Sequence, residues 1–426
     1  MENSLVDIHI PNGFRAIKEA HVHFDGIAVV SGINGCGKST LSKLLYFTFK
    51  NSQKYDRIVL SHFNERLEPF YDVLNQLQRH ITFSVPAARR ITTRIRLRSL
   101  YKSEAFLKMV KELCDDFLNQ VAEAEETGEQ VVSERLLRIL QSAVEDESTT
   151  DLATLFEKFQ SIVTDIVQEG VQTAINRPRN LLIDRISKDF QEPFPRNVSV
   201  SEYGDSFIGT DEGAVPLPHY IQHVAYIDTP MIVGCDLFDS PSYWEDLNDL
   251  LKEEPTDDFD KKINDTLQNE ILHGEAMYDN DVFDEFQFRR EDGQIFDLFK
   301  CATGIKSFSI LQLLLRNGFL KKDTLLIIDE PEAHLHPQWI VEYARIVLLL
   351  HQRLGVKFFI ASHSTDFVGA MKEIAQSVGI ENLNFYLAEN AGEMQYIYRD
   401  LGKDVEPIFA SFNKSYEKLD FYASQE

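Results

Sequence analysis

The chain has 426 residues and a formal net charge of −25, with 43% hydrophobic and 26% charged residues. This balance is typical of a globular protein with one large domain or a few ordinary ones. It excludes a general nucleic-acid-coating protein, because duplex DNA would repel most of so acidic a surface. The sequence has neither a leader-like start nor a run of about 18 apolar residues, so we expect a cytoplasmic protein without a membrane segment.

Three strands are predicted near the N-terminus, and the third leads into a glycine-rich loop. Val6–Ile10 and Ala20–Phe24 alternate between apolar and polar residues, as half-buried strands do. Gly26–Val30 is an apolar run, and the segment Gly32–Thr40 (GINGCGKST) follows it, before apolar residues at helical spacing. This order of strand, loop and helix is the context in which such a loop binds nucleotide phosphates.

Each residue type in the loop suits phosphate binding. Glycines let successive backbone N–H groups turn toward phosphate oxygens, the lysine contacts the outer phosphates, and the serine hydroxyl ligates magnesium. We therefore expect ATP and Mg²⁺ at this loop. The predicted ATP-binding residues are Gly32, Asn34, Gly35, Cys36, Gly37, Lys38, Ser39 and Thr40.

Residues 55–196 are predicted to form a mainly helical insertion. From about Lys102 to Ile175 apolar residues recur every three or four positions, in runs of two or three heptads, which favours a helical hairpin or small bundle. A β-hairpin is predicted before them, at about 81–98. On its second strand Arg94, Arg96 and Arg98 alternate with apolar residues. This basic face is either a contact for nucleic acid or a partner protein, or a solvated face paired with the chain's own acids.

Strand-like character returns after the insertion. Residues 197–233 contain a clear strand at His223–Pro230, and residues 245–282 are acidic and predicted as surface helix and loop. Residues 283–299 are predicted to form a hairpin with a glycine-containing turn. A helix is expected over Lys306–Arg316.

Two apolar strands near the C-terminus each carry polar side chains at their ends. One ends in Asp329-Glu330, and the other is followed by His363, with a helix opening at Pro337 between them. This βαβ unit implies parallel pairing. In ATP hydrolysis Ser39 and Asp329 would hold magnesium, Glu330 would orient or deprotonate the attacking water, and His363 would contact the γ-phosphate.

The order of these motifs resembles the ABC-type ATPases of the SMC and OLD group. The most specific part is the segment from Glu330 to Pro337, EPEAHLHP. The resemblance implies an α/β ABC-type ATPase head, with a mixed sheet core and an antiparallel β lobe, over residues 1–54 and 197–426. In such ATPases two heads sandwich ATP, and a signature segment of one protomer contacts the γ-phosphate bound by the other. That role falls to Thr303, Gly304 and Lys306.

OLD nucleases carry a toprim domain after the head, and the stretch that follows His363 is too short for one. The chain therefore resembles stand-alone ATPase subunits of antiphage systems such as Septu and PARIS. This resemblance implies a homodimer or higher homo-oligomer, a regulatory ATPase that controls a separate HNH or toprim nuclease, and a DNA or phage-protein trigger. Two other functions remain open: an SMC-like clamp for DNA repair or chromosome maintenance, and a nucleotide-dependent scaffold with little turnover.

Overall fold

The computed structural model describes residues 4–84, 95–127, 134–209, 213–233, 240–280 and 284–412. The chain divides into two compact units. Unit 1 comprises residues 1–53, 186–211 and 215–426, and unit 2 comprises residues 54–185 and 212–214. In the described part of the chain, no helix is both long enough and apolar enough to cross a membrane.

The centre of unit 1 is a mixed sheet, which has ten strands in the described residues, in the order β5-β4-β1-β2-β13-β12-β3-β11-β10-β6. The five strands from β12 to β6 run parallel to one another, and β1, β2, β4 and β5 are joined by antiparallel pairings. Between these groups β13 pairs antiparallel with β12 and parallel with β2. The bounds are β1 Val6–Ile10, β2 Ile17–Phe24, β3 Ile27–Ser31, β4 Ser199–Glu202, β5 Asp205–Ile208, β6 His223–Ile227, β10 Thr324–Asp329, β11 Lys357–Ser362, β12 Leu383–Asn390 and β13 Tyr396–Gly402.

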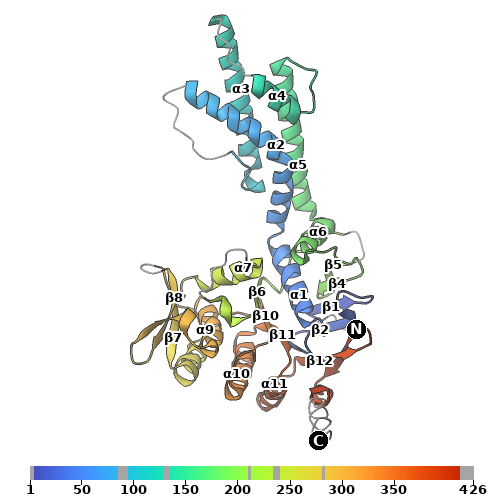
Figure 1. The fold of residues 1–426 in the computed structure, drawn as a ribbon, viewed down its shortest axis with the longest axis vertical. Coiled ribbons are helices and arrows are strands. Elements are labelled where there is room, and N and C mark those ends of the chain that lie inside the picture. The colour runs from blue at the N-terminus through green and yellow to red at the C-terminus, as the bar shows by residue number, and fades with distance from the viewer. Residues whose placement is uncertain are drawn as a thin grey trace, which may run out of the picture. The chain divides into compact units, whose positions relative to one another are not determined.

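Helices cover both faces of the parallel strands (Figure 1). Alternate residues of β3 and β10, such as Val29 and Ile328, share one buried apolar cluster with α9 (Thr303–Arg316), α10 (Pro337–Leu354) and α11 (Thr365–Val378). The intervening residues of these strands are equally buried, and α1 (Lys38–Gln53) contacts β6, β10 and β11. Strands buried on both faces read as continuous apolar runs, which is why the sequence predicted β3, β10 and β11 correctly.

A three-stranded antiparallel sheet lies elsewhere in unit 1, with the order β7-β8-β9. The predicted hairpin over residues 283–299 is confirmed as β8 (Glu285–Arg290) and β9 (Ile295–Asp297). The prediction of surface helix and loop for residues 245–282 is wrong in part, because Gly274–Asp279 forms β7 beside β8. The preceding helices, α7 (Ser242–Leu251), α8 (Lys261–Asp265) and a π-helix (Thr266–Leu272), bury Leu247, Ile263, Leu267 and Ile271. The α/β class, with a mixed sheet core and an antiparallel lobe, is that expected for an ABC-type ATPase head.

Unit 2 is helical, as the apolar spacing predicted. Its helices are α2 (Tyr55–Ser84), α3 (Ser103–Thr127), α4 (Glu134–Ala143) and α5 (Leu152–Asn176), with a short 3₁₀ turn at Leu100–Lys102; α6 (Arg179–Phe190) crosses the unit boundary. Aromatic rings fill the interior, and the fully buried ones include Phe63, Phe117, Phe156 and Phe159.

The predicted β-hairpin at about 81–98 is wrong where the structure describes it. Residues 81–84 continue α2, and residues 95–99 belong to no strand; Arg94 lies outside the described residues. The backbone N–H of Ile95 donates to Asn75 Oδ1 at 2.9 Å, and that of Leu97 donates to the hydroxyl of Tyr71 at 3.1 Å. Side chains of α2 thus replace the expected strand, while Ile95 and Leu97 face inward and Arg96 and Arg98 face solvent.

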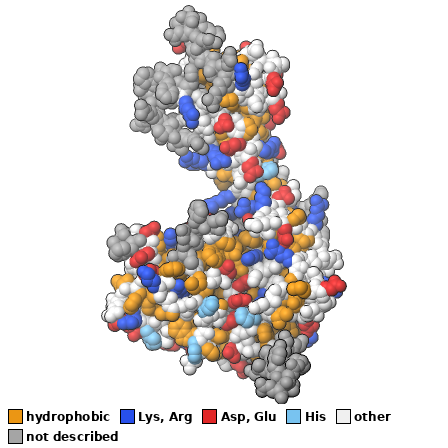
Figure 2. All heavy atoms as spheres, in the orientation of Figure 1, with side chains coloured by type: hydrophobic (Ala, Val, Ile, Leu, Met, Phe, Trp, Pro, Cys, Tyr) orange, Lys and Arg blue, Asp and Glu red, His pale blue; other side chains and the backbone are white. Residues whose placement is uncertain are grey.

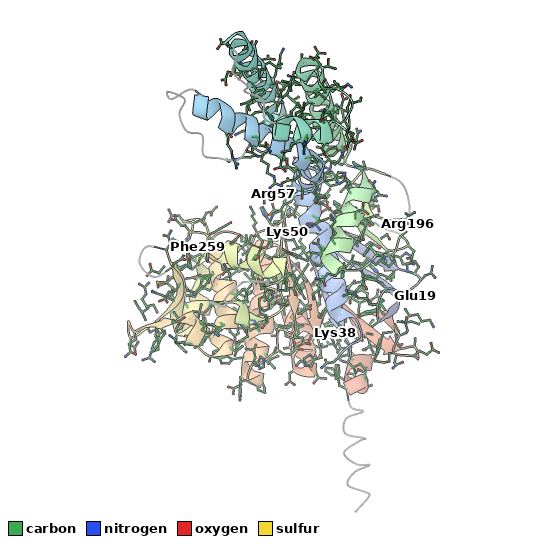
Figure 3. The ribbon with its side chains drawn as sticks, turned by 45° about the horizontal axis from the view of Figure 1, so that its top comes forward. Glu19, Lys38, Lys50, Arg57, Arg196 and Phe259 are labelled. Carbon is green, nitrogen blue, oxygen red and sulfur yellow. The ribbon has the colours of Figure 1, made fainter. Side chains whose placement is uncertain are left out.

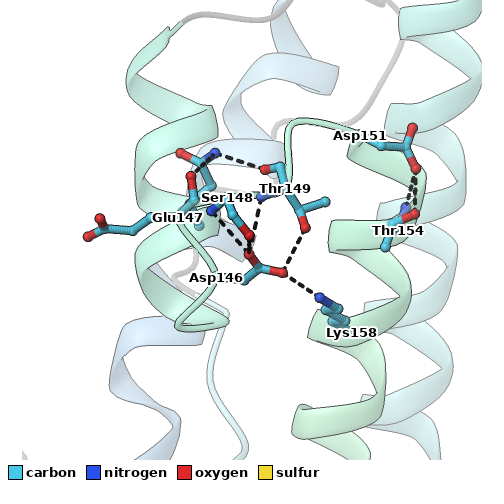
Figure 4. Close-up of polar contacts among 8 residues, drawn as sticks. Asp146, Glu147, Ser148, Thr149, Asp151, Thr154 and Lys158 are labelled. Carbon is cyan, nitrogen blue, oxygen red and sulfur yellow. Dashed lines mark hydrogen bonds and ion pairs between the residues drawn. The ribbon is translucent and has the colours of Figure 1, made fainter.

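The loop between α4 and α5 is held by one carboxylate (Figure 4). Asp146 Oδ1 accepts hydrogen bonds from the backbone N–H groups of Ser148 and Thr149, each at 3.1 Å, and Oδ2 accepts one from Lys158 of α5. The Lys158 ammonium and the loop donors hold the pKa of this carboxyl well below its usual value.

Candidate functional site

The phosphate loop connects β3 to α1 (Figure 3, which labels Lys38 at the start of α1). Asn34, Gly35 and Ser39 are exposed, whereas Cys36 is fully buried and its carbonyl accepts a 3.0 Å hydrogen bond from the hydroxyl of Tyr398 on β13. Gly37 has φ +99°, and a Cβ there would lie 2.6 Å from Ile17 Cγ1 of β2. Only glycine therefore fits at position 37. The loop packs against Ile17 of β2 and Tyr398 of β13, so its shape depends on segments from both ends of the chain.

Lys38 is turned back onto its own loop. Its side chain is buried, and Nζ donates to the carbonyl oxygens of Gly32 at 2.8 Å and Ile33 at 3.1 Å. The first turn of α1 carries no acidic residue, and the N-terminus of a 16-residue helix favours an anion. A positive side chain and a helix N-terminus thus meet where phosphate oxygens are expected.

Asp329 ends β10 and is almost completely buried, at 6% exposure. Its Oδ1 accepts a hydrogen bond from Ser42 of α1, its Oδ2 accepts one from the hydroxyl of Tyr226 at 2.7 Å, and Ser39 also hydrogen-bonds to the carboxyl. Burial raises the pKa of Asp329, and these three hydroxyl donors partly offset that effect. The structure therefore brings together Ser39 and Asp329, the two predicted magnesium ligands.

The chemistry of these donors fits magnesium, which prefers oxygen ligands and retains several waters. A hydroxyl and a carboxylate stand together, and a buried carboxylate gains from a nearby cation. In the described residues no group of three or more His, Cys, Asp or Glu side chains could hold a metal ion by itself.

Asp228, which the sequence reasoning missed, lies beside Asp329. It directly follows β6, whose Ile227 pairs with Ile328 of β10, so the two aspartates stand at the ends of adjacent parallel strands. Trp244 Nε1 donates to Asp228 Oδ1 at 2.7 Å. Burial raises the pKa of Asp228, and the Asp329 carboxylate raises it further. Only the parallel pairing of β6 with β10 reveals this neighbour.

Glu330 follows Asp329 with a change of backbone direction. Its φ of +49° lies in the left-handed region, which few non-glycine residues adopt, and its N–H donates to Ala361 O of β11 at 2.7 Å. His363 Nδ1 lies 3.6 Å from Glu330 Oε1. Both side chains are partly exposed, so the two predicted catalytic residues meet at one accessible edge of the sheet.

Glu332 is a second residue that the sequence reasoning missed. It is only 7% exposed, and Oε1 accepts hydrogen bonds from the backbone N–H of His363 at 2.7 Å and from Ser362 Oγ at 3.0 Å. Burial raises the pKa of this carboxyl. The feature of the sequence that could have identified Glu332 is its place in the segment EPEAHLHP, directly after the proline.

The predicted signature residues open α9. Thr303 is half-buried at the first helical position, and Gly304 is buried beneath Trp339 of α10, whose ring carbon Cε3 would lie 2.5 Å from a Cβ at position 304. Lys306 is 3% exposed, and its Nζ lies 4.8 Å from the ring centre of Phe299. Ala302, the N-cap, supplies no side-chain hydrogen bond to the helix.

Comparisons with known proteins identify a domain type in part of the chain. Residues 176–368 match the family described as "AAA domain, putative AbiEii toxin, Type IV TA system". The match includes Asp228, the start of α9, Asp329, Glu330 and His363, whereas the phosphate loop precedes it. A search of the curated proteins found no match.

Solved structures of SMC heads are similar to this chain at low identity. The Smc head domain with an extended coiled coil, bound to the C-terminal domain of ScpA, from Pyrococcus furiosus is 10% identical over 98% of both chains, with a TM-score of 0.35. The SMC head domain from Thermotoga maritima is 14% identical over 37% of this chain and 51% of that one, with a TM-score of 0.26. The Smc head domain with a coiled coil and joint from Pyrococcus yayanosii is 10% identical over 90% and 63%, with a TM-score of 0.28.

Proposed function

We propose that this protein is an ATPase of the ABC and AAA type whose nucleotide cycle controls a separate effector. One observation carries the ATPase part of the proposal. Ser39, in the first turn of α1, hydrogen-bonds to Asp329 at the end of β10, and Glu330 and His363 meet where the neighbouring parallel strands β10 and β11 end. A phosphate-binding loop, a metal-binding carboxylate and a water-activating carboxylate are the parts that phosphoryl transfer to water requires.

Each side chain has one task in this reaction. Lys38 would leave the Gly32 and Ile33 carbonyls for the outer phosphates, and Ser39 and Asp329 would hold magnesium directly or through water. The ion, when bound, neutralises charge on the phosphates. Glu330 would accept a proton from the attacking water, and His363 would donate a hydrogen bond to the γ-phosphate.

We also propose that ATP joins two copies of the chain through the start of α9. The free first-turn amides of this 14-residue helix and the Thr303 hydroxyl are the groups that a partner's γ-phosphate would meet. Gly304 would contribute close packing against Trp339, and the buried Lys306 would contribute positive charge beside the helix start.

The family description, which names a toxin of a type IV toxin–antitoxin system, supports a role in bacterial defence. We therefore propose an antiphage function in which the ATPase restrains or releases a nuclease of the HNH or toprim class. DNA or a phage protein would serve as the trigger.

Three measurements test these proposals. ATP hydrolysis by the purified chain should be lost in Lys38→Ala, and ATP should convert Glu330→Gln from monomer to dimer in light scattering, because trapped nucleotide holds the two heads together. Equal hydrolysis by Lys38→Ala would contradict the ATPase assignment, and a monomer at saturating ATP would contradict the dimer. Co-purification of the native protein from its host should bring down a nuclease; purification without any partner would contradict effector control.

A DNA clamp is the second candidate, and the placement of Arg96 and Arg98 favours it. Both are exposed and alternate with the buried Ile95 and Leu97, although Arg96 pairs with Glu68 at 3.3 Å. Figure 2 shows several Lys and Arg side chains on the visible face of unit 2. DNA-stimulated hydrolysis that is lost in the triple variant of Arg94, Arg96 and Arg98 would support the clamp.

A further inference from the structure

Lys306, near the start of α9, is a charged residue that no opposite charge balances. It is only 3% exposed, and among the described residues its ammonium has neither a hydrogen bond nor an ion pair. The group that meets the ammonium is the ring of Phe299, whose centre lies 4.8 Å from Nζ. Withdrawing an ammonium from water is costly, and a neutral ring offsets only part of that cost, so packing alone does not explain a lysine here.

The side chain of Lys306 runs back toward the start of its own helix. Phe299 and Cys301, which both precede α9, lie near the ammonium: burial raises the pKa of the Cys301 thiol, and the Lys306 charge opposes that rise. The backbone N–H of Lys306 donates to Ala302 O at 3.2 Å, so the N–H groups of the three residues before it have no partner within the helix. An unpaired ammonium beside unpaired helix amides is an arrangement that binds anions.

A capped turn holds Phe299 in this place. Asp297, which ends β9, accepts a 3.0 Å hydrogen bond from the Phe299 N–H and opens the 3₁₀ turn Leu298–Lys300. Leu298 is fully buried, and Lys300 pairs with Asp297 at 3.1 Å. The backbone of Phe299 is therefore fixed, although its side chain is 43% exposed.

An aromatic ring differs from a carboxylate as a partner for an ammonium. The π face of the ring attracts the cation without cancelling its charge. A carboxylate at position 299 would neutralise Lys306 and repel a phosphate. The Phe299 ring thus keeps the ammonium in place and leaves its charge available to an anion.

We propose that Phe299 is a positioning residue whose ring holds the Lys306 ammonium at the start of α9, where it meets the terminal phosphate of ATP bound to a second copy of the chain. This inference rests on the ATP-joined dimer proposed above. Phe299 itself touches no phosphate.

Dimerisation of the full-length Glu330→Gln protein at saturating ATP tests the proposal, with analytical ultracentrifugation as the measurement. Phe299→Leu keeps an apolar side chain over Lys306 but removes the π face. We expect the protein concentration that gives half dimer to rise about tenfold, because each dimer contains this contact twice and a cation–π contact changes an equilibrium constant several-fold. Phe299→Tyr, which restores the ring, should return that concentration to within about twofold of the parent value.

A matched control separates the ring's effect on Lys306 from a general loss of apolar surface. Phe296→Leu is the same substitution at a neighbouring phenylalanine that is 37% exposed and lies against Arg290 instead. It should leave dimerisation unchanged. Lys306→Met should weaken the dimer at least as much as Phe299→Leu, and adding Phe299→Leu to Lys306→Met should cause no further loss, because the ring acts through the ammonium.

A second readout needs neither nucleotide nor dimer. The rate of Cys301 alkylation by iodoacetamide, followed across pH by mass spectrometry of the Cys301 peptide, gives the pKa of this thiol. Lys306→Met should raise that pKa, because a nearby ammonium favours the thiolate. Phe299→Leu should raise it in the same direction, because the released ammonium moves into solvent, and Phe299→Tyr should not.

The outcomes separate this inference from the dimer on which it rests. If the Glu330→Gln protein with Phe299 in place stays monomeric at saturating ATP, the proposed dimer is wrong, and the proposed meeting of Lys306 with a partner's phosphate is wrong with it. If the dimer forms, unchanged dimerisation in Phe299→Leu, equal weakening by Phe296→Leu, or failure of Phe299→Tyr to restore it would overturn the positioning role alone. A Cys301 pKa that Phe299→Leu does not shift would also overturn that role.

Discussion

Tyr226 donates a hydrogen bond of 2.7 Å to Oδ2 of Asp329, and the two residues lie 103 positions apart in the sequence. This contact joins β6 to the end of β10 and places a neutral donor on the carboxylate that we assign to magnesium. Burial raises the pKa of the Tyr226 hydroxyl well above its usual value, so it stays protonated.

We therefore expect Tyr226→Phe to lower the free energy of unfolding of the nucleotide-free protein by about 1.5–3 kcal/mol, the usual value of a hydrogen bond to a charged group. Urea denaturation measures this change. Tyr220→Phe, at a residue that is 53% exposed, should change stability by less than about 0.5 kcal/mol. Equal effects of the two substitutions would contradict the role of the contact.

Glu330→Gln should bind ATP and turn it over at least about tenfold more slowly, because the amide cannot take a proton from water. Nucleotide binding by fluorescence and phosphate release measure the two properties separately. Glu342→Gln, on α10 beside Arg345, provides the control for the loss of one carboxylate. Unchanged phosphate release in Glu330→Gln would remove this residue from the mechanism.

Gly304→Ala should destabilise unit 1 by about 1 kcal/mol or more. A Cβ at this position would lie 2.5 Å from the Trp339 ring, and overpacking of this kind costs about 1–3 kcal/mol. Gly369→Ala in α11 is the matched control, because its Cβ would make only ordinary contacts with the Phe409 ring, at 3.5 Å to Cζ and 4.0 Å to Cε1, and alanine is the better helix former. Thermal unfolding should therefore shift down for the first variant and not for the second.

Asp146→Asn should increase hydrogen exchange at the amides of Ser148 and Thr149, because a neutral amide oxygen accepts their hydrogen bonds more weakly and loses the Lys158 ion pair. The lowered pKa of Asp146 sets the pH dependence. The stabilisation that the Asp146 carboxylate contributes is complete above the usual aspartate pKa of about 4. It is lost as the pH falls through the lower pKa that this carboxyl has in the folded protein. The difference between wild type and variant should shrink over that range, and a difference independent of pH would contradict the charge argument.

The sequence predicted those elements whose partners lie nearby in the chain or whose burial is complete. β10, α10 and β11 form a βαβ unit with short connections, so apolar runs and the Pro337 helix start located them. The predicted hairpin at 81–98 was wrong because alternating apolar and polar residues show which side of a segment is buried. They do not show which groups hydrogen-bond to its backbone. There, Asn75 and Tyr71 of a helix satisfy N–H groups that a strand would otherwise satisfy.

The site was predictable where residue type alone dictates chemistry, as for Lys38, Ser39, Asp329 and Glu330. Asp228, Tyr226 and Glu332 were not predicted, because their places at the site arise from the order of strands in the sheet and from the turn after Asp329. The same aspartate or tyrosine on a strand elsewhere in the sheet would be an ordinary residue, and only the pairing of β6 with β10 gives it a neighbour at the site.

The contact between Tyr398 and the Cys36 carbonyl has a consequence for synthesis of the protein. β12 and β13 stand between β2 and β3 in the sheet, although Tyr398 of β13 is made 362 residues after Cys36. The nascent chain therefore carries an incomplete phosphate loop until β13 emerges, and it gains a finished nucleotide pocket only then. In the proposed ATPase, ATP would stabilise that finished state and not the earlier ones, so the nucleotide itself would distinguish chains that contain β13 from interrupted ones.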